Sequence, residues 1–395
     1  MAGPDLSGLV NAPMLAWARE MARLDVEAAA KRAGTTANRL QEWEAGTRAP
    51  TLSQLRSLGN AYKRSIGVFF LREIPRDGGP LPVDYRRFEL SMPHFMSPRL
   101  AAGIREAQAK REAALDIFKE LEEEPPQFDL HVSRNTLPED AAHYIAERLG
   151  IAIETRRAWA DPYAALAGWR TAIEALGVIV IQLSGVLLSE MRGVAISTAS
   201  LPIILLNSSD RPLGRLFSLL HELTHLARSE SALCDEIEDA PREDASQAIE
   251  IYCNHVAGAL LVPGDSLLQH PLVQGAGPDS AWSNQDLDVL RRAFWASREV
   301  VLRRLLILGR TSQAHYRDMR AAFQAEYEAM REAPRQGFVP PPRKVVLGNG
   351  RLLTRLVLDA YAASAITGVE FSRILGAKLD HLPKIADIMR ERAPL

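Results

Sequence analysis

Two histidines and a glutamate in the pattern His221-Glu222-x-x-His225 constrain this chain more than any other feature of its sequence. Pro212 follows polar residues that can cap a helix, and apolar residues then recur at helical spacing, so the pattern is predicted to lie on a helix. Residues four apart on a helix share one face, which lets both imidazoles bind one metal ion. Glu222 can then reach a water held by the metal without binding the ion itself, as a general base must.

A third metal ligand is expected on a second helix, because a catalytic zinc usually has three protein ligands and one open position. The sequence from Asp244 predicts this helix, which ends before Pro263. Glu250 and Asn254 stand one turn apart on a face distinct from its apolar face. The sequence therefore predicts a Zn²⁺ site with His221, His225 and Glu250 as ligands, Glu222 as catalytic base and Asn254 as a hydrogen-bond partner of a ligand.

These motifs resemble a known family. The stretch from Phe217 to Leu226, followed by Glu250-x-x-x-Asn254-x-x-Ala257-x-x-Leu260-Leu261-x-Pro263, is similar to the ImmA/IrrE family of metallopeptidases. Residues 193–197 and 202–207 resemble the two short strands that precede the active-site helix in that family. The resemblance implies a zinc protease of gluzincin type that acts on a repressor protein. Thr224 and Val256 depart from the family pattern, in which glycine and phenylalanine are usual, and both concern helix packing.

Composition places the chain among ordinary globular proteins. Its 395 residues, 47% hydrophobic and 24% charged, are enough for two or three domains. Cys234 and Cys253 are the only cysteines, so disulfides are not its framework, and Cys253 is expected in the core. The longest apolar runs are far shorter than the roughly 20 residues of a membrane span, and a signal-peptide pattern is absent. We expect a cytoplasmic protein with no membrane partner.

The net charge of −2 argues against a uniformly basic surface, but the basic residues gather near the N-terminus. Between Met14 and Arg72 there are ten basic and five acidic residues. Predicted helices at 13–22 and 26–33, a stop at Gly34, and a helix at 37–44 stopped at Gly46 have the spacing of a helix-turn-helix. The spacing alone also fits any small helical bundle with a glycine turn.

The same region is similar to the XRE/Cro-type repressor domain. The resemblance runs from Ala29 to Thr51 and continues through predicted helices at 52–58 and 60–70. Asp25-Val26 departs from it, because that family usually has a polar pair with a glutamine there. The resemblance implies binding of a double-stranded DNA operator as a dimer or paired module. It places Thr36, Ala37, Asn38 and Gln41 toward base edges, and Arg39 and Arg48 toward phosphates.

The rest of the chain is predicted to be mainly helical with a small β-sheet, an α+β fold. Strands are expected at 178–182 and at the two segments named above, and a proline-rich break at 334–342. Helices are expected at 100–124, 138–149, 162–176, 287–308 with a turn near Ser297, 316–331, 351–361 and 372–389. The predicted domains are 1–72, an all-α DNA-binding bundle; 73–125, a linker with a glycine- and proline-rich part at 75–82, a short element at 83–88 and a connecting helix; 126–310, the gluzincin-like peptidase; and 311–395, a helical C-terminal region.

Two functional hypotheses follow. The first is a DNA-binding transcriptional regulator whose zinc endopeptidase cleaves a partner protein, such as a repressor or toxin from the same operon. A substrate would then lie extended along residues 192–198, because added-strand pairing holds a backbone of any sequence. The second is a DNA-binding regulator or antitoxin whose zinc domain only senses or binds a partner. Glu222 favours the first, because a purely structural zinc site needs no base. Tyr252 and His255 are expected to have packing or surface roles.

Overall fold

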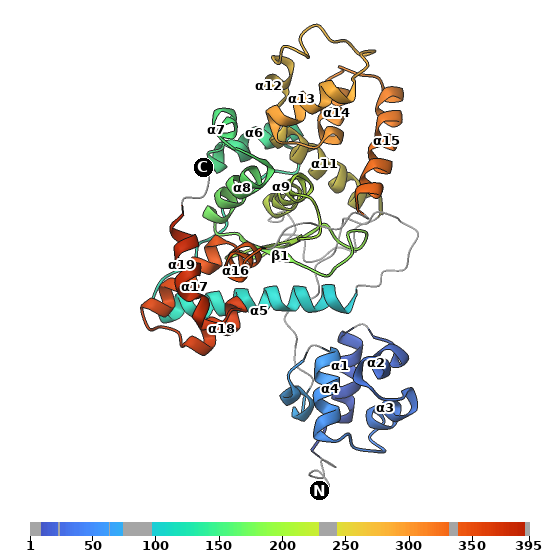
Figure 1. The fold of residues 1–395 in the computed structure, drawn as a ribbon, viewed down its shortest axis with the longest axis vertical. Helices are drawn as coiled ribbons and strands as arrows, with labels where there is room; N and C mark the ends of the chain where they lie inside the picture. Colours follow the sequence, from blue (N-terminus) through green and yellow to red (C-terminus); the bar gives the residue numbers. More distant parts are fainter. Residues whose placement is uncertain are drawn as a thin grey trace. The chain divides into compact units, whose positions relative to one another are not determined.

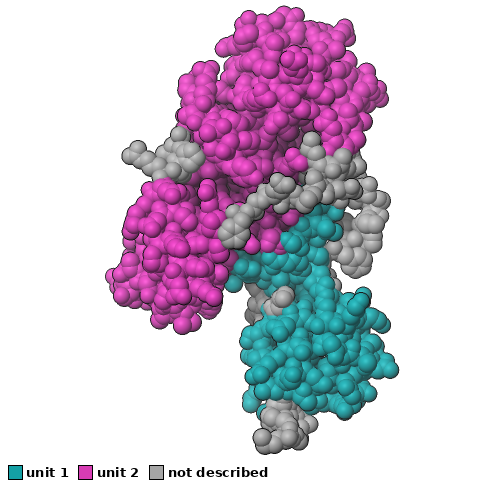
Figure 2. Space-filling view, in the orientation of Figure 1, with its two compact units in different colours: residues 1–81, 87–109, 185–190 teal, residues 82–86, 110–184, 191–395 magenta. Residues whose placement is uncertain are grey.

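The computed structural model describes residues 9–22, 24–62, 64–73, 97–228, 243–331 and 339–391. The linker predicted at 75–82 and the element predicted at 83–88 lie outside these residues. The chain divides into two compact units (Figure 2). One comprises residues 1–81, 87–109 and 185–190, and the other residues 82–86, 110–184 and 191–395. No helix among the described residues has the length and apolarity to cross a membrane.

The N-terminal bundle contains α1 (Ala12–Met21), α2 (Val26–Ala33), α3 (Ala37–Glu44), α4 (Leu52–Tyr62) and the 3₁₀ helix η1 (Ile66–Phe70) (Figure 1). Its core includes the buried side chains of Met14, Leu40, Trp43 and Leu55. The division predicted between 58 and 60 is wrong, because Gly59 lies inside α4. A Cβ there would come within 2.9 Å of the Arg64 carbonyl oxygen, so the glycine makes room for the returning chain.

The turn between α2 and α3 is held by local caps. The Asp25 carboxylate accepts a hydrogen bond from the Ala28 N–H, and Gly34 ends α2 in the left-handed region with φ 69°. The Thr36 hydroxyl accepts the Arg39 N–H at the start of α3. Arg19 on α1 forms an ion pair of 2.8 Å with Glu44 on α3, and this partner raises the pKa of Arg19. The geometry is that of a helix-turn-helix.

The second unit contains a three-stranded sheet in the order β1-β3-β2. β1 (Ile179–Leu183) runs parallel to β3 (Ile203–Asn207), and β2 (Gly193–Ile196) runs antiparallel to it. Every residue of β3 is buried, which explains its unbroken apolar run. The Asn207 amide at its end donates to the Met191 carbonyl oxygen at 2.9 Å and so fixes the chain before β2.

Helices make up most of the second unit (Figure 1). The expected strands, the turn near Ser297 and most expected helices are confirmed, whereas α7, α12 and α16 are additional. The prediction of a break through residue 342 is wrong, because Pro341 begins α16. Proline suits a first helical turn, whose N–H groups have no helical partner.

The helices are α5 (Pro98–Glu120, which spans both units), α6 (Pro138–Leu149), α7 (Ile153–Arg157), α8 (Pro162–Ala175), α9 (Pro212–Arg228), α11 (Glu243–Leu261), α12 (Gly264–Leu268), α13 (Asn284–Phe294), α14 (Arg298–Ile307), α15 (Gln313–Arg331), α16 (Pro341–Asn349), α17 (Arg351–Ala362), α18 (Gly368–Leu375), η2 (Leu379–His381) and α19 (Leu382–Arg390).

The C-terminal helices pack against the edge of the sheet through α16 and β1. A buried ion pair supports this contact. Arg170 on α8 donates to Glu174 at 3.0 Å and to the Leu347 carbonyl oxygen at 2.6 Å. The Glu174 carboxylate also accepts the Arg351 N–H at 2.9 Å, at the start of α17. Burial raises the pKa of Glu174, and Arg170 opposes that rise, so the pair stabilises the charged carboxylate inside the protein.

A second ion-pair network joins α6, α11 and α14. The Glu139 carboxylate accepts two hydrogen bonds from Arg304, at 2.6 and 2.9 Å, and lies 2.8 Å from His255 Nε2. Only 1% of Arg304 is exposed, and it also donates to the Val262 carbonyl oxygen. Burial works to raise the pKa of Glu139, but the bonds from His255 and Arg304 outweigh it and hold the pKa at about 2. This stabilisation is therefore present above pH 4.5 and is lost as the pH falls toward 2.

We expect Glu139→Ala to lower the free energy of unfolding of this unit by about 3 kcal/mol, because Arg304 would stay buried without its carboxylate partner. The value is at the low end for a buried pair, since the Glu139 side chain is 44% exposed. Urea denaturation measures the change. Glu147→Ala on the same helix is the control and should cost less than about 0.5 kcal/mol, because its partner His143 is exposed. Equal losses in both variants would contradict the role given to Arg304.

Candidate metal centre

Helix α9, which carries His221, Glu222 and His225, is fixed at its start by Asp210. This buried carboxylate accepts the Arg211 N–H at 2.8 Å and pairs with Arg192 at 2.9 Å, just before β2. A Cβ at Gly214 would come within 2.6 Å of the Asp210 carboxylate, so the glycine lets the first turn pass close to it. Pro212 therefore begins the helix as predicted, and Asp210 ties its start to the sheet through Arg192.

The predicted ligands come together. His221 Nε2 lies 3.0 Å from His225 Nε2, and the Glu250 carboxylate on α11 lies 3.3 Å from the first and 3.1 Å from the second. Donor atoms around a tetrahedral zinc, each about 2.0–2.1 Å from the ion, are about 3.3 Å apart. Two imidazole nitrogens and one carboxylate oxygen are also ligands that zinc accepts. The three residues therefore fit a zinc ion by both spacing and chemistry.

Glu222 lies beside this cluster and is only 3% exposed. Its carboxylate rests against Gly193 at the start of β2, where a Cβ would come within 2.7 Å of Glu222 Oε1. The proximity of its negative charge contributes to raising the pKa of His225. The contact with Gly193 was not predicted, since it joins residues far apart in the sequence; only the glycine at the start of a strand hinted at a close approach.

The three candidate ligands also affect one another's protonation. Burial works to raise the pKa of Glu250, but hydrogen bonds with His221 and His225 outweigh it and hold the pKa at about 2. Burial works to lower the pKa of His225, yet hydrogen bonds with Cys253 and Glu250 raise it to about 10. A metal binds the neutral imidazole, so binding competes with the His225 proton and strengthens as the pH rises.

The predictions for the residues around Glu250 are confirmed in part. Cys253 is fully buried, as predicted, but it also hydrogen-bonds His225, which its position three residues after Glu250 could have indicated. The Tyr252 hydroxyl donates to the Thr136 carbonyl oxygen, and His255 joins the Glu139 network, so both have structural contacts. Asn254 lies one turn beyond Glu250 and is partly exposed. Its expected bond to a ligand stays a prediction.

The proposed DNA contacts lie on and after α3. Asn38, Arg39, Gln41 and Arg48 are exposed, and Ala37 is half-buried. The exposed Thr36 caps the helix, while Leu40 and Trp43 are buried on its inner face, as expected. Arg48 lies 3.7 Å from Glu42, in an exposed pair that costs little to separate. These side chains can reach DNA, and their individual contacts stay predictions.

Two family models match the chain. Residues 15–69 match a helix-turn-helix family, and residues 173–306 match the IrrE N-terminal-like domain of the M78 peptidase family. The second match includes the sheet, the three candidate ligands and α14 up to residue 306. No curated protein and no solved structure gives a significant match. The chain thus joins an XRE-type helix-turn-helix domain to an ImmA/IrrE-like domain of a metallopeptidase family.

Proposed function

We propose that this protein is a DNA-binding transcriptional regulator whose zinc-dependent endopeptidase cleaves a partner protein. The observation that carries the proposal is the cluster of His221, His225 and Glu250 beside the buried carboxylate of Glu222. The two His Nε2 atoms lie 3.0 Å apart, and each lies 3.1–3.3 Å from an oxygen of Glu250. A bound zinc ion would supply Lewis-acid chemistry to a peptide carbonyl. The helix-turn-helix family match supports the DNA-binding part of the proposal.

Each residue of the centre has a distinct task in this proposal. His221, His225 and Glu250 would hold the metal. Glu222 accepts a proton from the attacking water and returns it to the leaving amine, so its side chain must stay beside the three ligands. Because Gly193 has no side chain, it leaves room for the Glu222 carboxylate beside β2. Because β2 is an edge strand, an extended substrate can pair with residues 192–198 and bring a peptide bond toward the centre.

The partner is proposed to be a repressor or toxin encoded in the same operon. Binding of the chain to its operator would raise its local concentration near such a protein, so the peptidase would not need a tight substrate site. To test cleavage, new protein N-termini are mapped by mass spectrometry in cells that produce the wild-type chain or Glu222→Gln. Termini that need Glu222 identify the substrate. If no terminus depends on it while repression remains, a non-proteolytic regulator or antitoxin replaces this proposal.

The DNA contacts give a separate prediction. Asn38→Ala and Gln41→Ala should reduce discrimination between operator and unrelated duplexes by about 1–3 kcal/mol, because amide side chains read base edges. Arg48→Ala should weaken all duplexes alike and reduce the salt dependence. Titrations of the intact chain at several salt concentrations measure both effects. Asn60→Ala, an exposed amide on α4, is the matched control. Equal losses on every duplex from all three changes would reject these roles.

A further inference from the structure

A cysteine lies against one of the candidate metal ligands. Cys253 stands on α11 three positions after Glu250, and its side chain is fully buried. It hydrogen-bonds the ring of His225 on α9. Residues three apart on a helix are neighbours on its surface, so Glu250 and Cys253 can reach the same ring. Helix α11 therefore contacts His225 twice, once through an oxygen and once through a sulfur.

The two contacts use different nitrogens of the imidazole. His225 Nε2 lies 3.0 Å from His221 Nε2 and 3.1 Å from the Glu250 carboxylate, so this nitrogen faces the position of the metal. Cys253 is not in the group of residues whose ligand atoms all lie within 4.8 Å of one another. Its sulfur therefore stands outside the donor group. The ring nitrogen that remains for it is Nδ1, because an imidazole has only two nitrogens.

A hydrogen bond at Nδ1 matters for metal binding. An imidazole that binds a metal through Nε2 carries its proton on Nδ1, and the partner of that N–H fixes both the tautomer and the orientation of the ring. Carboxylates, carbonyl oxygens and water are the usual partners. Sulfur is a weaker acceptor, but Cys253 is fully buried, so water does not compete for the bond.

The two histidines differ in how tightly packing holds them. The His221 side chain is 0% exposed, and its ring lies beside that of Phe217, with 6.3 Å between the ring centroids. The His225 side chain is 13% exposed. Packing alone therefore restrains His225 less, and a hydrogen bond that holds its ring has more effect there than it would have at His221.

We propose that Cys253 is a positioning residue of the metal centre, whose sulfur accepts the Nδ1–H of His225 and so directs Nε2 toward the metal. The thiol does not bind the metal itself, so it does not complete a closed, four-ligand structural site. The role given to Cys253 rests on the metal centre of the proposed function. It adds to that centre a residue that acts on the metal through His225.

Zinc affinity of the intact chain gives the first test. Cys253→Ala should weaken zinc binding by about 10- to 100-fold, the usual loss for the partner of a ligand, as competition with a chromophoric chelator measures. Cys253→Ser should recover most of the affinity, because its hydroxyl can accept the same N–H. Val256→Ala is the matched control, since it removes buried atoms from the same helix and should keep its zinc affinity. Equal losses in Cys253→Ala and Val256→Ala would reduce Cys253 to a packing role and overturn the proposal.

Cobalt(II) gives a second test that reports on each ring. The unpaired electrons of cobalt shift the proton resonances of the imidazoles that bind it, so each Nδ1–H gives a separate exchangeable signal. In Cys253→Ala the signal of His225 should move and exchange faster with water, while that of His221 stays. A sulfur-to-cobalt charge-transfer absorption that disappears in Cys253→Ala would make Cys253 a fourth ligand. That result would overturn the proposal and count against an open, catalytic site.

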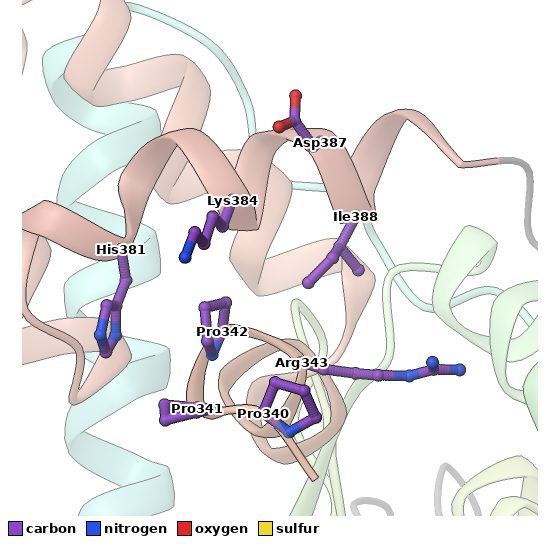
Figure 3. A pocket seen from close by; sticks show the side chains of 8 residues that line it. All are labelled: Pro340, Pro341, Pro342, Arg343, His381, Lys384, Asp387 and Ile388. Carbon is purple, nitrogen blue, oxygen red and sulfur yellow. The ribbon is translucent and has the colours of Figure 1, made fainter.

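Because cobalt can also bind a histidine elsewhere, His381 provides a control. It lines a hollow of about 460 Å³ between α19 and the start of α16. Figure 3 shows its ring directed toward Pro341 and Pro342, whereas the Asp387 carboxylate points away, so this carboxylate does not join the imidazole as a ligand. His381→Ala should leave the metal affinity and both signals unchanged. Loss of a signal in this variant would assign that signal to the hollow and overturn the proposal.

The outcomes separate the role of Cys253 from the proposed function. A wild-type chain that binds neither zinc nor cobalt would overturn both the metal centre and the role of Cys253. Equal zinc affinity in the wild-type chain and Cys253→Ala, with the His225 signal unchanged, would overturn the role of Cys253 alone. A weaker Cys253→Ala, a recovered Cys253→Ser and a changed His225 signal are the results expected.

Discussion

Replacing Glu222 by glutamine is expected to leave zinc bound and to slow cleavage of the partner protein by a factor of about 10² to 10⁴. The amide has nearly the same shape but cannot accept the proton of the attacking water. Zinc stays because the ligand atoms belong to His221, His225 and Glu250. Single-turnover cleavage and metal analysis on the same preparation measure both effects. Loss of zinc from Glu222→Gln would reject its assignment as the base, and unchanged cleavage would reject the mechanism.

Gly193→Ala tests whether the position of Glu222 matters as well as its charge. The added Cβ would come within 2.7 Å of Glu222 Oε1, so the carboxylate must shift. We expect slower cleavage with normal zinc content, because the metal ligands are on α9 and α11 and not on β2. Gly277→Ala is the control, since its added Cβ meets nothing within 4 Å. A normal rate in Gly193→Ala would show that the contact with β2 does not position the base.

Elements with local signals were predictable from the sequence. The bounds of α2 and α3 agree with the prediction because Asp25, Gly34 and Thr36 act on hydrogen bonds within a few residues of themselves. The spacing of His221 and His225 likewise fixed their common helix face before any tertiary contact was known. Such predictions succeed where the physical cause and its effect lie within one or two helical turns.

Contacts between distant segments were not predictable in this way. The distance from Glu250 to the two histidines depends on how α9 packs against α11, and the helical pattern indicated only a face. Three contacts join residues far apart in the sequence. They are the close approach of Gly193 to Glu222, the ion pair of buried Arg304 with Glu139, and the packing of α16 on β1. The prolines at 340–342 suggested a break in the chain, although proline is compatible with the first turn of a helix, where Pro341 and Pro342 lie.

Removing a metal ligand should have a large effect on zinc binding. We expect about one zinc per chain in the wild-type protein, because three ligands and one open position suit this ion. His221→Ala or Glu250→Ala should weaken zinc binding by more than about a hundredfold, beyond the 10- to 100-fold loss usual for a partner of a ligand. Competition with a chromophoric chelator measures the affinity.

His255→Ala is the matched control for these variants, because His255 lies on α11 near Glu250 but bonds Glu139 instead of joining the metal cluster. It should keep its zinc. Asn254→Ala should lose about 10- to 100-fold in affinity, because its amide is expected to support a ligand, and unchanged affinity would reject that role. Zinc at a hundred times its dissociation constant should stabilise the wild-type fold by about 2.7 kcal/mol, a gain that His221→Ala forfeits while His255→Ala retains it. Equal zinc affinity in His221→Ala and His255→Ala would show that His221 is not a zinc ligand and would reject the proposed metal centre.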